Sequence, residues 1–307
     1  MYYPYLRGKQ FELIALREFS EAYPQSHKIV PIIEPVKTPL ASLRRALETL
    51  EKNNLSCFVI LNPNAGDFAH INAGDSIFQQ CNGIASFNPA FLCDNYNIDN
   101  LSDYINQWHL SNVMIVFKDD INSTDSKVIS FLNSDKIQYV VGEFGRSLKK
   151  HLIEADKKLI TFGDYFNNRN ANAEYDKCPD EKYSEEHTFY VEDKYYGFSD
   201  YCVLPKNMPD GGMIPAAVAI HLTYKKNDEE IWVHHYVSDT QHGRQNIQAK
   251  FKEAALKVKD DYEQNILPDT FAIRSLITNL EEEKFPGLGV LKKYSILNHL
   301  ELLNAIL

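Results

Sequence analysis

The stretch from Lys28 to Lys37, KIVPIIEPVK, decides the fold of this chain. It is a short β-branched run, closed by Pro35, that places Glu34 and Lys37 at its end. β-Branched residues favour strands, whereas proline cannot continue the ladder of a central strand. We therefore expect a buried strand that ends in polar residues.

The same pattern recurs along the chain, with helix-like segments between most of its copies. Each copy is an apolar run followed by a polar residue, and the later copies are FVILN ending in Asn62, AFLCD in Asp94, MIVFK in Lys118, VVGEF with Glu143, and LITFGD ending in Asp164. Buried parallel strands are nearly continuous apolar runs, and in an α/β barrel their carboxyl ends form one rim. The sequence predicts an α/β fold, a (β/α)8 TIM-like barrel.

Helical periodicity lies between these strands and after them. A first strand is expected over 2–6, and apolar residues at helical spacing predict helices over 11–23, 40–53, 98–108, 126–132, 148–155, 245–262, 271–284 and 296–306. We read residues 1–307 as a single barrel domain that closes with a C-terminal helical segment over 268–307.

The late part of the chain offers more strands than a barrel needs. The run 196–204 carries Asp200 and is a candidate eighth strand, while 217–237 has the pattern of a β-hairpin. Either the first run is an insertion or the hairpin is an accessory to the barrel. The polar segment 167–195 has no sustained period and is predicted to be a surface loop or lid.

Composition excludes several classes of protein. The formal net charge is −10 and no dense Lys/Arg block occurs, so there is no strong nucleic-acid signal. No apolar run reaches the roughly 20 residues of a spanning helix, which predicts a protein without a membrane segment. The five cysteines are odd in number and contain no CxxC pair, which is typical of reduced thiols in a cytoplasmic protein.

Three stretches together resemble a known family. The opening YYPYLRGKQFELIALRE, the strand PIIEPVK, and the late YGFSDY followed by the hairpin are similar to the bacterial and phage family called simply "beta protein". The resemblance implies an α/β barrel of undetermined activity and a role in phage–host conflict. It brings no assigned catalytic residues.

A common rim would gather the polar strand ends into one site. Eight residues end or follow the predicted strands: Arg7, Glu34, Asn62, Asp94, Lys118, Glu143, Asp164 and Asp200. Crowded carboxylates raise one another's pKa and a nearby lysine lowers them, so such a group supplies an acid and a base near neutral pH. We assign the catalytic core to Glu34, Lys118, Glu143 and Asp164, and ligand binding to Arg7, Lys37, Asn62, Asp94, Arg146, Asp200 and His235.

A metal is the alternative chemistry for the same rim. Three carboxylates could hold Mg²⁺ or Mn²⁺ through hard oxygen ligands, as in metal-dependent phosphodiesterase barrels. Lys37 and Arg146 would then suit a phosphate or carboxylate group. The cofactor stays open at this point.

Structural roles compete with every one of these assignments. Glu34 with Lys37, or Glu143 with Arg146, could form simple salt bridges. His234 and His235 lie on opposite faces of their strand, and His221 is the expected cross-strand neighbour of one of them. A zinc site of His221, His235, Asp239 and His242 fits no HExxH pattern, and a solvated polar hairpin is the favoured interpretation.

Two functions follow from this sequence. The first is a rim site that binds a small polar or phosphorylated ligand, with hydrolysis as a possible step and phage defence as the context. The second is a non-catalytic scaffold in which the polar segment and the hairpin bind a protein partner. No GxSxG elbow, phosphate-binding P-loop or convincing GxGxxG occurs, so those routes to hydrolysis or nucleotide binding are disfavoured.

Overall fold

The computed structural model describes residues 1–119, 125–207 and 214–307, and these form two compact units. The first unit comprises 1–13, 20–163 and 188–200, and the second comprises 14–19, 164–187 and 201–307. The predicted barrel is the first unit. We describe each unit by itself.

Eight parallel strands form the sheet of the first unit in the order β1-β2-β3-β4-β5-β6-β7-β9. The strands are β1 (Tyr5–Leu6), β2 (Ile32–Ile33), β3 (Cys57–Ile60), β4 (Phe87–Leu92), β5 (Val113–Val116), β6 (Ile137–Val141), β7 (Lys158–Gly163) and β9 (Gly197–Asp200). Every residue of β3 and β5 is buried, as apolar parallel strands require. The predicted (β/α)8 architecture is confirmed.

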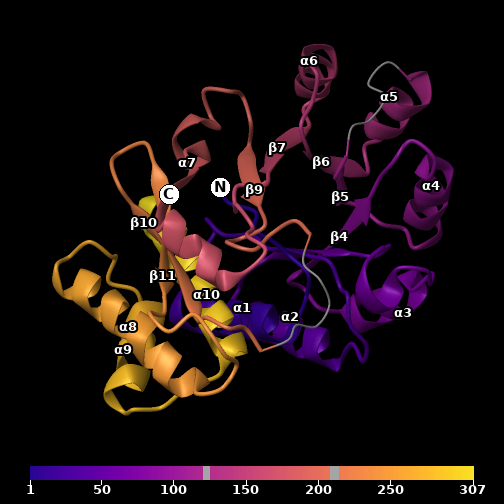
Figure 1. The fold of residues 1–307 in the computed structure, drawn as a ribbon. Helices are drawn as coiled ribbons and strands as arrows, with labels where there is room; N and C mark the ends of the chain where they lie inside the picture. The colour runs from indigo at the N-terminus through magenta and orange to yellow at the C-terminus, as the bar shows by residue number, and fades with distance from the viewer. Residues whose placement is uncertain (120–124, 208–213) are drawn as a thin grey trace. The chain divides into compact units, whose positions relative to one another are not determined.

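Helices alternate with these strands. They are α1 (Gln10–Ala22), α2 (Ala41–Lys52), α3 (Gly74–Cys81), α4 (Ile98–Gln107), α5 (Ser126–Leu132) and α6 (Arg146–Glu154), with the short η1 (Gly66–Phe68) and α7 (Glu186–Phe189). Figure 1 shows α3 to α6 on the outer side of strands β4 to β7. Their buried faces carry the predicted periodic residues, for example Leu43, Leu47 and Leu50 of α2.

The barrel closes where its last strand meets the amino-terminal end of the chain. Tyr2 bridges both Ile29 and Phe198, and the Tyr3 N–H donates to the Phe198 carbonyl at 2.8 Å. A Cβ on Gly197 would lie 2.6 Å from the Tyr3 ring, so only glycine allows this approach. The run 196–204 is therefore the eighth strand and not an insertion.

That eighth strand is shorter than its apolar run. Cys202 and Val203 adopt positive φ of 52° and 61°, a left-handed conformation that ends the strand after Asp200. The hairpin predicted over 217–237 is present as β10 (Ala219–Lys225) and β11 (Ile231–Val237), and it belongs to a separate antiparallel sheet of order β10-β11-β8.

The second unit builds that three-stranded sheet partly from the polar segment. Residues 167–195 contain η2 (Asn172–Lys177) and β8 (Asp180–Ser184), so the segment has regular structure that its composition does not predict. The helices of this unit are α8 (Ile247–Glu263), α9 (Phe271–Glu281) and α10 (Leu288–Ile306). Asn298 of α10 donates to the Thr223 carbonyl at 2.9 Å, and Tyr236 donates to Asp261 of α8 at 2.7 Å, so both helices pack on the sheet.

Candidate functional site: the barrel mouth

Strand alternation brings Tyr5 and Glu34 to the interior of the barrel. Tyr5 is paired in register with Ile32, and neighbouring residues in register point to the same face of a sheet. Glu34 lies two residues beyond Ile32, so its side chain points to that face too. Tyr5 also contacts the ring of Phe162 on β7 at 5.3 Å between centroids, which places this face inside the barrel.

A buried carboxylate and a lysine meet there from different strands. The Lys118 ammonium, which follows β5, donates to Glu34 Oε2 at 2.8 Å. The Tyr5 hydroxyl donates to the same oxygen at 2.7 Å, and the Asn64 N–H lies 3.4 Å from Oε1. The Glu34 side chain is 0% exposed, whereas that of Lys118 is 21% exposed. We call Tyr5, Glu34 and Lys118 the mouth triad.

The mouth triad fixes a charged group at the opening of the barrel. A buried carboxylate is stable only with hydrogen-bond donors around it, and Tyr5 and Lys118 supply them. The ammonium lies 5.0 Å from the centroid of the Tyr5 ring, a cation–π distance. The arrangement therefore offers a cation at the solvent boundary and a proton acceptor behind it.

A divalent metal does not fit this arrangement. The Lys118 ammonium occupies Glu34 Oε2 and would repel a second cation. Among the described residues, no group of three or more His, Cys, Asp or Glu side chains is placed to hold a metal ion. The Mg²⁺ or Mn²⁺ alternative, and the zinc set of the hairpin, therefore have no ligand cluster in this part of the chain.

Three other rim residues have local structural partners. Asn62 donates to the Leu92 carbonyl and accepts from the Leu92 N–H, both at 2.8 Å, and so extends the β3–β4 ladder. Asp94 accepts the N–H groups of Tyr96 and Asn97 in the turn before α4. Lys37 is half exposed and pairs with Asp67 at 3.1 Å, not with Glu34.

The remaining predicted rim residues differ in burial and in their place in the fold. Glu143 and Arg146 are both exposed, and no ion pair joins them within the described chain. Arg7 is buried, and its N–H donates to Glu12 Oε2 at 2.6 Å. Asp164 follows β7 directly, is exposed, and belongs to the second unit. Within the first unit, the structure brings Glu34 and Lys118 of the predicted catalytic core into contact.

Two further predicted rim residues, Asp200 and His235, are buried. Asp200 is buried and accepts the Tyr2 hydroxyl at 2.6 Å. Tyr2 and Tyr5 differ by an odd number of residues, so strand alternation puts Asp200 on the outer face of the sheet. His235 lies on β11 in the second unit, 2% exposed, where His221 is its cross-strand partner as predicted.

Tyr5 is the mouth residue that sequence reasoning missed. An aromatic residue in a strand is usually core, and nothing in YYPYLR separates a buried ring from one whose hydroxyl reaches a carboxylate. The available signal was periodicity, because Tyr5 and Arg7 share the strand face whose end meets the rim.

Cysteine chemistry has no support at the described sites. Burial raises the pKa of Cys81 and of Cys93 to about 12, and burial raises that of Cys57 as well. These thiols stay protonated at neutral pH, whereas the nucleophile is the thiolate. They are core residues.

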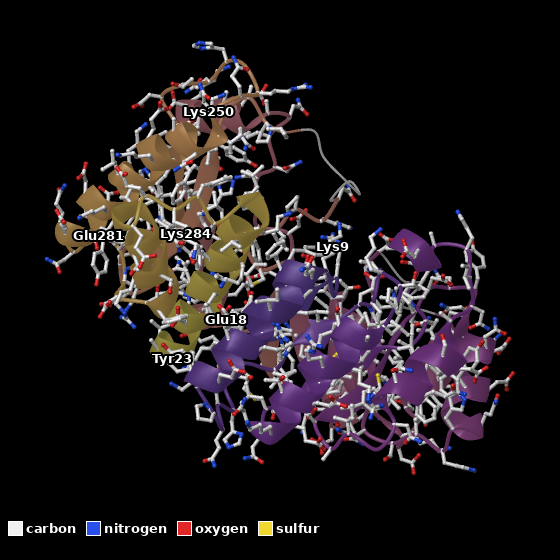
Figure 2. All side chains as sticks on the ribbon, turned by 90° about the horizontal axis from the view of Figure 1, so that it is seen from below. Lys9, Glu18, Tyr23, Lys250, Glu281 and Lys284 are labelled. Atoms are coloured by element: carbon white, nitrogen blue, oxygen red, sulfur yellow. The ribbon has the colours of Figure 1, made fainter. Side chains whose placement is uncertain are left out.

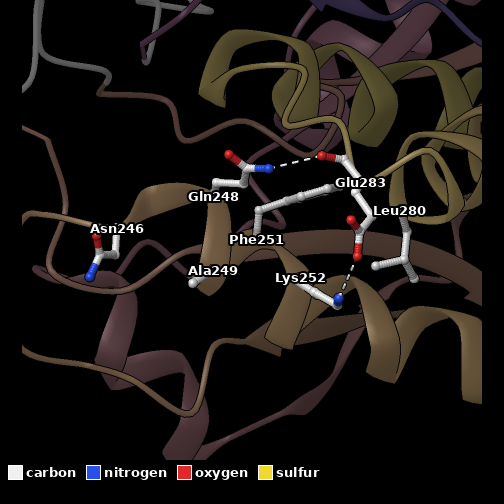
Figure 3. A pocket seen from close by; sticks show the side chains of 7 residues that line it. All are labelled: Asn246, Gln248, Ala249, Phe251, Lys252, Leu280 and Glu283. Carbon is white, nitrogen blue, oxygen red and sulfur yellow. Dashed lines mark hydrogen bonds and ion pairs between the residues drawn. The ribbon is translucent and has the colours of Figure 1, made fainter.

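The second unit has polar features of its own. The buried ammonium of Lys250, labelled on α8 in Figure 2, donates to the carbonyls of Ala216, His242 and Gly243 at 2.6, 2.9 and 2.8 Å. These bonds fix loops and leave the lysine in a structural role. A pocket of about 350 Å³ lies between α8 and α9, where Lys252 pairs with Glu283 (Figure 3).

Comparison with protein-family models, with curated proteins and with solved structures finds no match to this chain. The resemblance to the beta protein family therefore stays an expectation. Among the described helices, none is long and apolar enough to cross a membrane.

Proposed function

We propose that the barrel mouth binds a small polar or phosphorylated anion, with Lys118 as the ligand contact. The observation that carries this proposal is the asymmetry of the ion pair. The carboxylate of Glu34 is 0% exposed, while the Lys118 side chain is 21% exposed and so lies at the boundary with solvent. The ammonium that Glu34 holds at this boundary is a positive charge that an anion in solvent can approach.

Pre-organisation makes this lysine a better anion contact than an ordinary surface lysine. A free lysine side chain loses rotamer entropy when it binds, which weakens binding by about 1 kcal/mol. Here the carboxylate and the Tyr5 ring already hold the ammonium in place. The carboxyl ends of barrel strands are also where TIM-barrel proteins place their ligands.

We limit the function to binding. Hydrolysis of the metal-dependent phosphodiesterase type would need a carboxylate cluster, and the described residues offer none. Glu34 and Tyr5 do form a proton acceptor and a proton donor beside the lysine, so the mouth holds the groups that general acid–base chemistry uses.

The test is a thermal-shift titration of the full chain with inorganic phosphate, glycerol 3-phosphate, ribose 5-phosphate and citrate. A ligand at 100 times its Kd adds about 2.7 kcal/mol to the free energy of unfolding. We expect at least one anion to raise the Tm of wild type and of Lys37→Met, and not of Lys118→Met. Lys37→Met is the matched control, because it removes an exposed rim lysine that pairs elsewhere.

The alternative function is a non-catalytic protein-interaction scaffold in phage–host conflict. Val191, in the predicted polar segment, is apolar and 62% exposed, but a single exposed apolar residue is ordinary on a protein surface. No Tm response of the wild type to any of the four anions would overturn the anion proposal and leave the scaffold as the better account.

A further inference from the structure

Three neighbouring strands of the second unit bring two histidines and a glutamate into a row. His221 of β10 is paired in register with His235 of β11, and their Nδ1 atoms lie 2.7 Å apart. On the next strand, β8, Glu181 places its Oε2 3.5 Å from Nε2 of His235. The order across the sheet is His221, His235, Glu181.

The inner part of this row is closed off from water. His235 is 2% exposed, and the Tyr175 ring packs on both imidazoles at 4.7 and 4.6 Å between centroids. Phe166 packs edge-on against both rings as well. Glu181 is held by an ion pair with Arg169 and by the Asn167 amide, which donates at 3.3 Å. The geometry is therefore fixed from both sides.

The contacts determine where the protons sit. A separation of 2.7 Å between two Nδ1 atoms requires one N–H between them. The Glu181 carboxylate oxygen lies 3.5 Å from Nε2 of His235, an ion-pair distance without a hydrogen bond, and its charge favours the proton of neutral His235 on Nε2, so Nδ1 of His235 accepts. His221 then carries its own proton on Nδ1, and its Nε2 has a lone pair.

That lone pair belongs to the less buried of the two histidines. His221 is half-buried, and its Nε2 is not one of the buried side-chain atoms that lack a hydrogen-bond partner. Among the described residues, the side chain of His221 makes its hydrogen bond through Nδ1, to His235. Nε2 of His221 is therefore the acceptor at the less buried end of the row.

We propose that Glu181, His235 and His221 form a proton relay whose outer end, Nε2 of His221, is a general base. The ligand is a protic one, a water or a hydroxyl group. Its O–H bond breaks, an N–H bond forms at Nε2, and the oxygen keeps the electron pair. The imidazolium charge on His221 is stabilised through its Nδ1–H, which donates to His235, and through the Glu181 carboxylate behind it.

The electrostatic surroundings keep the base unprotonated at neutral pH. Burial, then His235 and Lys292, lowers the pKa of His221 well below its usual range. Burial lowers the pKa of His235 to about 4, opposed by Glu181 and assisted by His234 and Arg169. A neutral imidazole is the form that accepts a proton.

Nitrogen-15 NMR of the wild-type chain at pH 7.5 tests the relay without any substitution, because the two neutral tautomers of histidine have distinct ring-nitrogen shifts. We expect the Nδ1–H tautomer for His221 and the Nε2–H tautomer for His235. The Nε2–H tautomer at His221 would overturn the proposal, since that nitrogen would then have no lone pair.

Acylation by diethyl pyrocarbonate tests the basicity of the outer nitrogen. The reagent transfers its ethoxycarbonyl group to a neutral imidazole nitrogen and releases ethanol and CO₂. We expect modification of His221, none of His235, and a roughly tenfold slower reaction of His221 in Glu181→Gln, since loss of an orienting partner commonly costs 10-fold or more. The exposed His242 is the internal control, and its rate stays unchanged. Equal His221 rates in both proteins would contradict the relay.

Discussion

The mouth triad and the proton relay of Glu181, His235 and His221 stabilise buried polar side chains in opposite ways. Each is a polar group buried in a β-sheet, and burial without partners is costly for both. At the mouth, Glu34 and Lys118 carry opposite charges that stabilise each other. In the second unit, His221 and His235 avoid charge, because burial lowers the pKa of both. The first arrangement depends on a partner's charge, and the second depends on the solvent pH.

The largest expected loss of stability comes from breaking the ion pair of Glu34 and Lys118. Lys118→Met leaves the carboxylate of Glu34 buried with Tyr5 and the Asn64 N–H as its remaining donors. Removing one partner of a buried ion pair costs about 3 to 5 kcal/mol. Because Lys118 is partly exposed, water can reach the carboxylate in the variant. We therefore expect the free energy of unfolding, measured in urea, to fall by about 3 kcal/mol. A loss below about 1 kcal/mol would mean that the pair is not buried.

The second effect separates the two regions by pH. The folded-state pKa of His235 is lowered to about 4 from 6.5, so the native state binds fewer protons than the unfolded chain between these values. The stabilisation is therefore present above pH 6.5 and is lost as the pH falls toward 4. It amounts to roughly 3 kcal/mol for His235 when complete. We expect His235→Gln to flatten the pH dependence of urea unfolding over this range, whereas Tyr3→Phe, a substitution in the first unit that removes no charge, leaves its slope unchanged.

A smaller effect isolates one hydrogen bond of the mouth triad. Tyr5→Phe removes the hydroxyl that donates to Glu34 Oε2 at 2.7 Å. A hydrogen bond to a charged group contributes about 1.5 to 3 kcal/mol. Tyr3→Phe is the matched control two residues earlier in the chain, since among the described residues its hydroxyl meets only the Met1 sulfur, at 3.8 Å. The free energy of unfolding in urea should be clearly lower for Tyr5→Phe than for Tyr3→Phe. Equal values would show that the Tyr5 hydroxyl does not stabilise Glu34.

The smallest effect belongs to the exposed rim. Lys37→Met removes an ion pair whose side chains are 48% and 34% exposed. Pairs of this kind contribute about 0 to 1 kcal/mol. We expect the free energy of unfolding in urea to change by no more than about 0.5 kcal/mol. A larger loss would place Lys37, with Lys118, in the mouth.

The sequence predicted the architecture because parallel strands and amphipathic helices leave periodic patterns. The strand ends from β2 to β6 could be read as polar residues after buried runs. The apolar runs could not reveal the face of the sheet to which each terminal side chain points. Asp200 pairs with Tyr2, whose side chain lies on the opposite face from that of Tyr5. Strand β8 was missed because its half-polar sequence DEKYS has no apolar run.

Side-chain partners were less predictable than positions. Glu34 was grouped with Lys118 in the predicted core, with a local salt bridge to Lys37, three residues away, as the competing interpretation, and the structure pairs it with Lys118, 84 residues away. Local spacing favours the near partner, but closure of the barrel brings β2 and β5 to one interior. The His221–His235 pair was predicted because a hairpin fixes its own register. The position of Glu181 beside His235 could not be predicted, since its strand joins the hairpin from a distant segment of the sequence.

A double-mutant cycle tests most directly whether Glu34 and Lys118 meet inside a closed barrel. The free energies of unfolding of wild type, Glu34→Gln, Lys118→Met and the double variant give the coupling between the two side chains. We predict a coupling of roughly 2 kcal/mol, with the double variant more stable than Lys118→Met alone, because no buried charge is left without its partner. A coupling below about 0.5 kcal/mol would mean that the two residues act independently, and it would contradict the mouth triad.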